Sequence, residues 1–180
     1  MRHALKLHPD STCDAITGID VEFARTGERA LRLDYTARGT IANLRLAPLA
    51  APERKDELWR TTCFEAFFIL GEGHGYTEFN FAPSTAWASY RFKSYRDGMT
   101  PATGFETPRI TVGSTADRLH LSAALVFPHR PRDVDRVALS AVIEETNGRK
   151  SYWALAHPPG KPDFHHAIGF ALNLANEKFE

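Results

Sequence analysis

The chain has 180 residues, of which 43% are hydrophobic and 24% are charged, and its formal net charge is zero. A chain of this length can bury a full core without disulfides or metals, and we expect a single domain over residues 1–180. The balanced charge provides no basic field that would attract nucleic acid or anionic lipid. The sequence also has no run of eighteen apolar residues for a membrane span and no signal-peptide pattern at its start, so the expected location is the cytoplasm.

Alternation of apolar and polar residues begins near the N-terminus and runs through most of the chain. In one early stretch, Ile19, Val21 and Phe23 alternate with Asp20 and Glu22, which is the period of two that half-buried strands show. Eleven stretches share this pattern, and turn signals rich in Gly, Pro, Asn and Asp separate them. In chain order, the predicted strands are residues 3–8, 19–25, 30–37, 62–70, 76–82, 87–95, 109–114, 118–127, 136–146, 151–156 and 169–175.

Helix is scarce in the sequence. Residues 51–59 favour one or two helical turns, because Pro52 suits the first position of a helix and acidic residues follow it. The stretch around Trp87, Tyr90 and Phe92 also contains helix-compatible residues, but aromatic side chains at this spacing fit a strand better. About eleven short strands with regular turns therefore predict an all-β fold, an antiparallel β-sandwich of the jelly-roll type.

Three consecutive predicted strands carry polar residues on one face and aromatic residues on the other. Assigning the aromatic sets to the core leaves an outward set made of Glu65, Glu78, Asn80, Trp87 and Arg91. If the three strands are neighbours, these side chains lie on one outer face of a sheet. A flat aromatic side chain with carboxylate, amide and guanidinium groups suits the recognition of a sugar ring. The alternative is an ordinary solvated face of an antiparallel sheet.

A proline-rich segment, HPPGKPDFHH, interrupts the strand pattern near the C-terminus. Its prolines cannot donate hydrogen bonds to a strand ladder, so residues 157–166 are predicted to form a stiff loop. Such a loop loses little entropy when it orders and can hold its side chains in fixed positions. We expect His157, Asp163 and His165 to lie at the rim of a pocket at the edge of the sandwich.

Other chemistries use the same residues. A zinc site could take His157, Asp163, His165 and His166 as ligands, although no HExxH or paired-cysteine pattern is present. A b-type haem could take His157, His165 or Met99 as an axial ligand. Glu65 and Glu78 could act together as an acid and a base. The two cysteines, Cys13 and Cys63, match no metal spacing, and both are expected to be free thiols. A purely structural role for the histidines, or a scaffold role for the protein, also stays open.

Three ordered motifs, LWRTTCFEAFF, YTEFNFAPSTAWASYRFKSYRDGM and YWALAHPPGKPDFHH, resemble the bacterial DOMON-like proteins, which are relatives of the family 9 carbohydrate-binding modules. The resemblance covers roughly residues 55 to 175. It implies a β-sandwich that binds a sugar or a haem and catalyses nothing itself. By motif position, the residues that correspond to the family's motifs are Trp59 and Glu65 in the first, Asn80 and Trp87 in the second, and Trp153 and His157 in the third.

The expectation that follows is a non-catalytic ligand-binding module for a carbohydrate or amino sugar, without a cofactor. Trp87 or Trp153 is expected to supply the surface on which the sugar ring stacks. A haem-binding sandwich and a sugar-acting enzyme that uses Glu65 and Glu78 are the alternatives. Neither nucleic acid nor a membrane is an expected partner, whereas a protein partner stays open.

Overall fold

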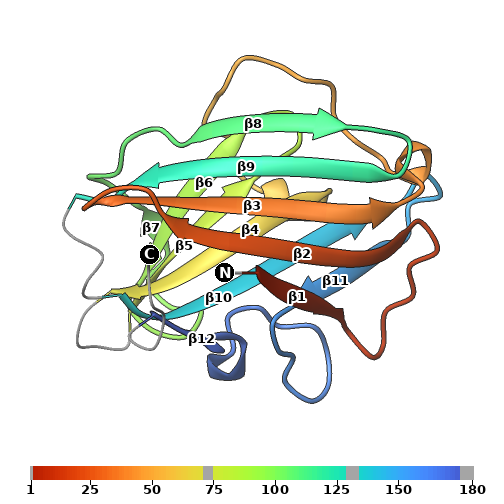
Figure 1. Ribbon diagram of the computed structural model, residues 1–180. Helices are drawn as coiled ribbons and strands as arrows, with labels where there is room; N and C mark the ends of the chain where they lie inside the picture. Colours follow the sequence, from red (N-terminus) through yellow and green to blue (C-terminus); the bar gives the residue numbers. More distant parts are fainter. Residues whose placement is uncertain (1, 71–74, 129–133, 175–180) are drawn as a thin grey trace.

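The computed structural model describes residues 2–70, 75–128 and 134–174 (Figure 1). In these residues the chain forms twelve β-strands and three short 3-10 helices, and none of the helices is long and apolar enough to cross a membrane. The strands are β1 (Arg2–Leu7), β2 (Ile16–Arg25), β3 (Ala30–Gly39), β4 (Cys63–Leu70), β5 (Tyr76–Phe81), β6 (Trp87–Phe92), β7 (Thr100–Pro101), β8 (Arg109–Ser114), β9 (Arg118–Val126), β10 (Val134–Glu144), β11 (Lys150–Ala154) and β12 (Leu172–Asn173). The helices are η1 (Ile41–Asn43), η2 (Leu58–Arg60) and η4 (Ala167–Gly169).

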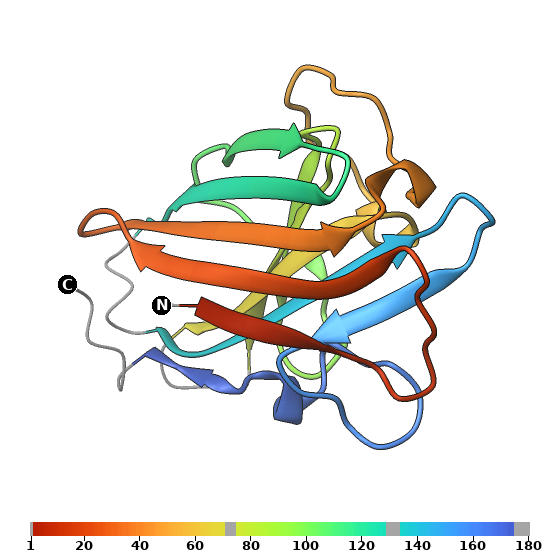
Figure 2. The ribbon, with the colours of Figure 1, turned by 45° about the vertical axis from the view of Figure 1, so that its right-hand side comes forward.

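The strands form two layers, which Figures 1 and 2 show from two directions. The first sheet has the order β1-β2-β3-β9-β8, the second has the order β7-β6-β5-β4-β10-β11, and β12 pairs with β10. All of these strand pairs are antiparallel. Strand β1 joins the layers, because its first residues pair with β2 while Lys6 and Leu7 pair with β11. The predicted all-β antiparallel sandwich is therefore confirmed.

The main core lies between the two sheets. Alternation places every second side chain of each strand on this inner side. The second sheet contributes Phe64, Phe68, Phe79 and Phe81, and these pack against leucines of β3 and β9. Tyr35 of β3 is fully buried there, and its hydroxyl donates a hydrogen bond of 2.8 Å to the carbonyl oxygen of Glu65.

The outer face of the second sheet is also covered. A second apolar cluster there is made of Leu58, Cys63, Phe67, Tyr76, Ala82, Ala86, Ala88, Tyr90, Phe92, Ala138 and Phe170. Its covering residues come from η2 and from the C-terminal segment that contains η4. All six residues of β5 are consequently buried. Polar side chains on this covered outer face can line a cavity, and the candidate site lies on this face.

The secondary structure differs from the sequence expectation in two places. The helical turns expected over residues 51–59 are reduced to the single 3-10 turn η2, because the segment before it runs extended and forms a bridge between Arg54 and Trp87. Strand β7 was not expected, since Thr100 and Pro101 show no alternation long enough to detect.

Candidate functional site

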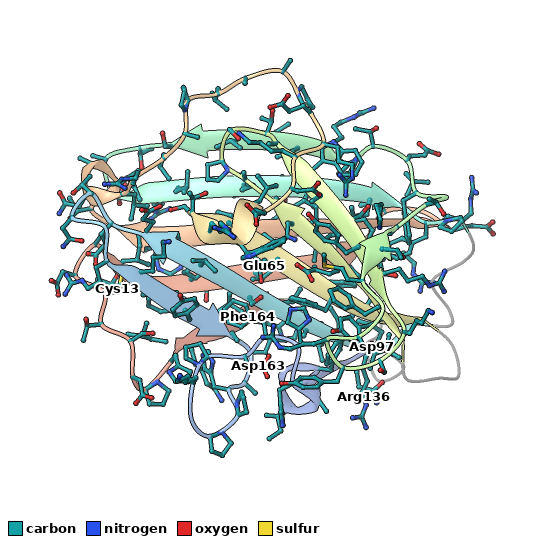
Figure 3. The ribbon with its side chains drawn as sticks, turned by 180° about the vertical axis from the view of Figure 1, so that it is seen from behind. Cys13, Glu65, Asp97, Arg136, Asp163 and Phe164 are labelled. Carbon is teal, nitrogen blue, oxygen red and sulfur yellow. The ribbon has the colours of Figure 1, made fainter. Side chains whose placement is uncertain are left out.

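A cavity of about 470 Å³ lies on the outer face of the second sheet. Figure 3 shows this face, with Glu65 near its middle and with Asp163 and Phe164 in the loop beside it. The cavity is lined by Trp59, Glu65, Glu78, Phe92, Arg96, Met99, Val142, Tyr152, Pro162, Phe164 and His165. These residues come from strands β4, β5, β6, β10 and β11, from η2, and from the loops that follow β6 and β11. Its volume is in the range of pockets that bind small ligands.

Two carboxyl groups lie in the cavity. In the pairing of β4 with β5, Glu65 is opposite Asn80 and Glu78 is opposite Phe67, so the two glutamates are diagonal neighbours on one face. Glu65 is 2% exposed and Glu78 is 4% exposed. Ser140 Oγ donates to Glu65 Oε2 at 3.1 Å, and Asn80 Nδ2 donates to Glu78 Oε1 at 2.7 Å. One oxygen of each carboxyl group is therefore fixed by a neighbouring strand residue.

Burial controls the ionisation of this pair. It raises the pKa of Glu65 well above its usual range, and repulsion from Glu78 adds to the effect. Burial also raises the pKa of Glu78 to about 7, although the hydrogen bond from Asn80 and the charge of Arg96 oppose the rise. Because Glu65 stays protonated while Glu78 ionises, a carboxylic acid and a carboxylate coexist in the cavity near neutral pH.

His165 forms the wall next to Glu78. The hydroxyl of Tyr76 accepts a hydrogen bond of 3.2 Å from the backbone N–H of Arg96 and lies 2.7 Å from His165 Nδ1. Burial lowers the pKa of His165 to about 4, and Arg96 contributes to the decrease, so the ring is neutral at pH 7. We assign the tautomer in which Tyr76 donates to Nδ1 and Nε2 carries the proton. That Nε2 is 3.9 Å from Glu78 Oε2, beyond hydrogen-bond distance.

Two loops are joined beside the cavity by Asp163. Its Oδ1 accepts a hydrogen bond of 2.7 Å from Arg96 Nη2 and one of 3.1 Å from the backbone N–H of His165. Its Oδ2 accepts a hydrogen bond from the hydroxyl of Tyr95. Arg96 itself has a left-handed backbone conformation, with a φ of +53°, which is uncommon for a residue other than glycine. We name this set, Tyr95, Arg96 and Asp163, the loop clasp.

Aromatic and flexible side chains complete the walls. Trp59, Phe92, Tyr152 and Phe164 bring ring surfaces to the cavity, and Met99, which is 53% exposed, lies at its open side. The Trp59 ring packs edge-on against Tyr90, with 5.7 Å between ring centroids. A cavity that combines aromatic rings with planar polar groups can bind a ligand that has both apolar and polar surfaces.

The structure brings four of the residues predicted from sequence together at the cavity, namely Trp59, Glu65, Glu78 and His165. Two more lie next to it. Asn80 is fully buried and holds Glu78 from the same strand. Asp163 is not a lining residue, but its hydrogen bonds fix the loop that carries His165.

The expectation that Trp87 and Arg91 share the outer face of Glu65 is wrong. In the pairing of β5 with β6, Trp87 is opposite Phe81 and Arg91 is opposite Thr77, so both belong to the inward-facing set. Trp87 packs against the main core, and Arg91 is exposed. The aromatic residues of β6 that seemed to mark the core instead belong to the second apolar cluster.

Trp153 and His157 do not line the cavity either. Trp153 is 4% exposed and belongs to the main core, where its Nε1 donates to Ser151 Oγ at 3.0 Å. Its neighbour Tyr152 points to the opposite face and reaches the cavity. His157 lies against His8, with ring centroids 4.8 Å apart, and its Nε2 donates to the carbonyl oxygen of Lys6 at 2.8 Å.

Sequence reasoning missed several lining residues. Pro162 and Phe164 lie in the proline-rich loop already expected to border a pocket, so that loop was a usable signal for them. Arg96 lies in the turn after β6, where no alternation indicates which way a side chain points, and Met99 of the same turn was considered only as a haem ligand. Within residues 2–70, 75–128 and 134–174, no group of three or more His, Cys, Asp or Glu side chains is arranged to hold a metal ion. Cys13 and Cys63 are free thiols.

Comparisons with known proteins give similarity of fold only. No family model and no curated protein matches the chain. A candidate carbohydrate-binding protein from Bacteroides uniformis superposes with a TM-score of 0.60 at 14% identity, over 94% of this chain and 84% of that one. A family 9 carbohydrate-binding module from Caldicellulosiruptor kristjanssonii, solved with glucose, gives a TM-score of 0.51 at 11% identity over 87% of this chain and 76% of that one. The same kind of module from that organism, solved with cellotriose, gives 0.50 at 11% identity, over 89% and 74%.

Proposed function

We propose that the chain is a non-catalytic module that binds a carbohydrate, amino sugars included, in the cavity over Glu65 and Glu78. The observation that carries the proposal is a small-ligand cavity whose walls are aromatic and in which two buried carboxyl groups lie. The similarity of fold to carbohydrate-binding proteins, two of them complexes with glucose and cellotriose, supports it. The proposal keeps the DOMON-like relationship that the three sequence motifs suggest.

The chemistry of the lining matches the two surfaces of a sugar. The C–H groups of a sugar ring pack against an aromatic ring, and Trp59 and Tyr152 offer such surfaces. Sugar hydroxyls can donate hydrogen bonds to the Glu78 carboxylate and accept one from protonated Glu65, and Glu65 Oε1 and Glu78 Oε2 receive no hydrogen bond from the described residues. The cavity therefore has a stacking surface and acceptors, which are the two elements that sugar recognition needs.

Isothermal titration with glucose, cellobiose, cellotriose and glucosamine tests the proposal. We expect at least one of these sugars to bind, and Trp59→Ala to weaken its binding by about tenfold or more, in line with the loss of a stacked ring. Trp87→Phe is the control, because Trp87 packs against the main core, on the face of the second sheet opposite to the cavity. Absence of binding across the panel, or equal binding by wild type and Trp59→Ala, would contradict the proposal.

Acid–base chemistry on a sugar is a second candidate, favoured by the acid and carboxylate that coexist in one cavity. The same sugars can be followed by NMR after incubation with the protein. Turnover that disappears in Glu65→Gln would make the module an enzyme.

Absorbance spectroscopy tests haem binding. A Soret band after addition of haem would indicate axial ligation, and for this His165 would have to leave its hydrogen bond with Tyr76.

A further inference from the structure

The two carboxyl groups of the cavity differ from the other buried acids of this fold. In the part of the chain that the structure describes, the other buried acids each pair with arginine: Asp20 with Arg2 and Arg38, Glu144 with Arg45, and Glu145 with Arg149. Among the described residues, no arginine or lysine forms an ion pair with Glu65 or Glu78. Since a buried charge normally requires a partner, the cavity lacks a cation where the rest of the protein supplies one.

The titratable groups around the pair do not provide that cation. The charge of Arg96 acts on both glutamates, but its guanidinium is hydrogen-bonded to Asp163. His165 faces Glu78 and is neutral. Three further titratable neighbours, Tyr35, Tyr76 and Cys63, carry no positive charge in any ionisation state, and burial raises the pKa of all three. In the free protein, protons held by Glu65 and Glu78, rather than a basic side chain, therefore limit the negative charge of the cavity.

One carboxyl oxygen of Glu65 and one of Glu78 remain available to a cation that carries several hydrogen-bond donors. Glu65 and Glu78 each use one carboxyl oxygen to accept a hydrogen bond from a strand residue, and their other oxygens receive none from the described residues. Both residues line the cavity. A primary ammonium group has three donors and can bridge two carboxyl groups. Aromatic rings on the walls, such as Trp59 and Phe92, also favour a cation, because ring faces attract positive charge.

We infer that the cavity selects sugars that carry a primary ammonium group, with the ammonium between Glu65 and Glu78 and the ring against Trp59. This inference rests on the proposed function and narrows its ligand to amino sugars. Binding then displaces a proton: the ammonium takes the place of the proton that the carboxyl pair holds, and that proton passes to solvent. No bond of the sugar is made or broken.

Isothermal titration at pH 6.5 with glucosamine, glucose and N-acetylglucosamine tests the inference, since these sugars differ only at one position. We expect glucosamine to bind about tenfold tighter or better, because only its ammonium can pair with a buried carboxylate. Repeating the titration in two amine-free buffers of different ionisation enthalpy should reveal the release of roughly one proton per glucosamine, with affinity rising by up to about tenfold from pH 5.5 to 6.5.

The variant Glu78→Gln, which keeps the shape of the side chain, should reduce both the preference for glucosamine over glucose and the proton release. Glu144→Gln is the matched control, because Glu144 is a buried acid outside the cavity, and it should keep both. If Glu78→Gln does not unfold cooperatively, Glu65→Gln serves the same purpose. Glucose binding as tightly as glucosamine, or glucosamine binding without proton release, overturns the inference while the proposed function stands. Failure of all three sugars to bind overturns both.

Discussion

At the scale of single residues, Trp59 and Trp153 show that tryptophan takes two different roles on the two sides of the second sheet. Trp153 is inside the main core and has its N–H satisfied by Ser151, whereas Trp59 is half-buried at the cavity. The motif resemblance pointed to both residues equally, because a sequence motif records a position in the chain and not the face to which a side chain points. The register of β11 places Trp153 on the inner face of the second sheet, whereas Trp59 lies in η2, which covers the outer face.

This difference predicts opposite results for two alanine variants. Trp153→Ala should cost about 3–5 kcal/mol of unfolding free energy, since it leaves a large void in a packed core. Trp59→Ala should cost clearly less, because its ring is partly solvated already, and should instead lose ligand binding. Urea denaturation of both variants measures the two costs. A larger loss of stability in Trp59→Ala than in Trp153→Ala would show that the roles are reversed.

At the scale of elements, alternation predicted where the strands lie, but it assigned the two faces of β6 incorrectly. For β4 and β5, the aromatic sets do face the main core. For β6 the same rule fails, because the second sheet is buried on both faces and its outer cluster also takes Tyr90 and Phe92. When both faces of a strand are apolar, composition no longer indicates which one is inside. The loops that cover the outer face carry no alternation, so the closure of the cavity could not be read from the sequence.

The loop clasp joins the loop after β6 to the loop after β11 through hydrogen bonds of Asp163. Asp163→Asn removes the charge that Arg96 pairs with and weakens the link between the loops after β6 and β11. Hydrogen exchange of backbone amides in residues 93–99 and 157–166 should become faster, and sugar affinity should fall several-fold, because ordering of the loops is then part of the cost of binding. Asp97→Asn is the control, as it changes a carboxylate of the same loop that is not bonded to Asp163. Equal exchange in wild type and Asp163→Asn would rule the clasp out.

At the scale of the whole molecule, the cavity lies where folding buries polar side chains at a cost in free energy. The second sheet packs one face against the first sheet and covers the other with loops, so polar residues that strand alternation would expose become buried. The free protein reduces that cost because burial raises the pKa of both carboxyl groups, so that Glu65 stays protonated and Glu78 ionises only near pH 7. Length, composition and alternation were enough to predict the sandwich, but the ionisation of the cavity depends on how the loops close over it.

Global stability should therefore depend on pH through Glu78. The pKa of Glu78 is about 7 in the folded protein and its ordinary value is 4.5, so the folded state binds the proton more tightly. The contribution is complete below pH 4.5 and is lost as pH rises through 7, and a shift of this size corresponds to about 3 kcal/mol.

Glu78→Gln cannot lose a proton, so its stability relative to wild type should rise between pH 4.5 and 8 by an amount of that order. Urea denaturation of both proteins at each pH measures the difference, and the titrations that the two proteins share cancel in it. Glucosamine should reduce the gap at the upper end of the range, because it supplies the wild-type carboxylate with a cation that the variant cannot use. A difference that stays constant with pH would show that Glu78 ionises in the folded protein as it does in water, and the absence of a cation partner would then have no energetic consequence.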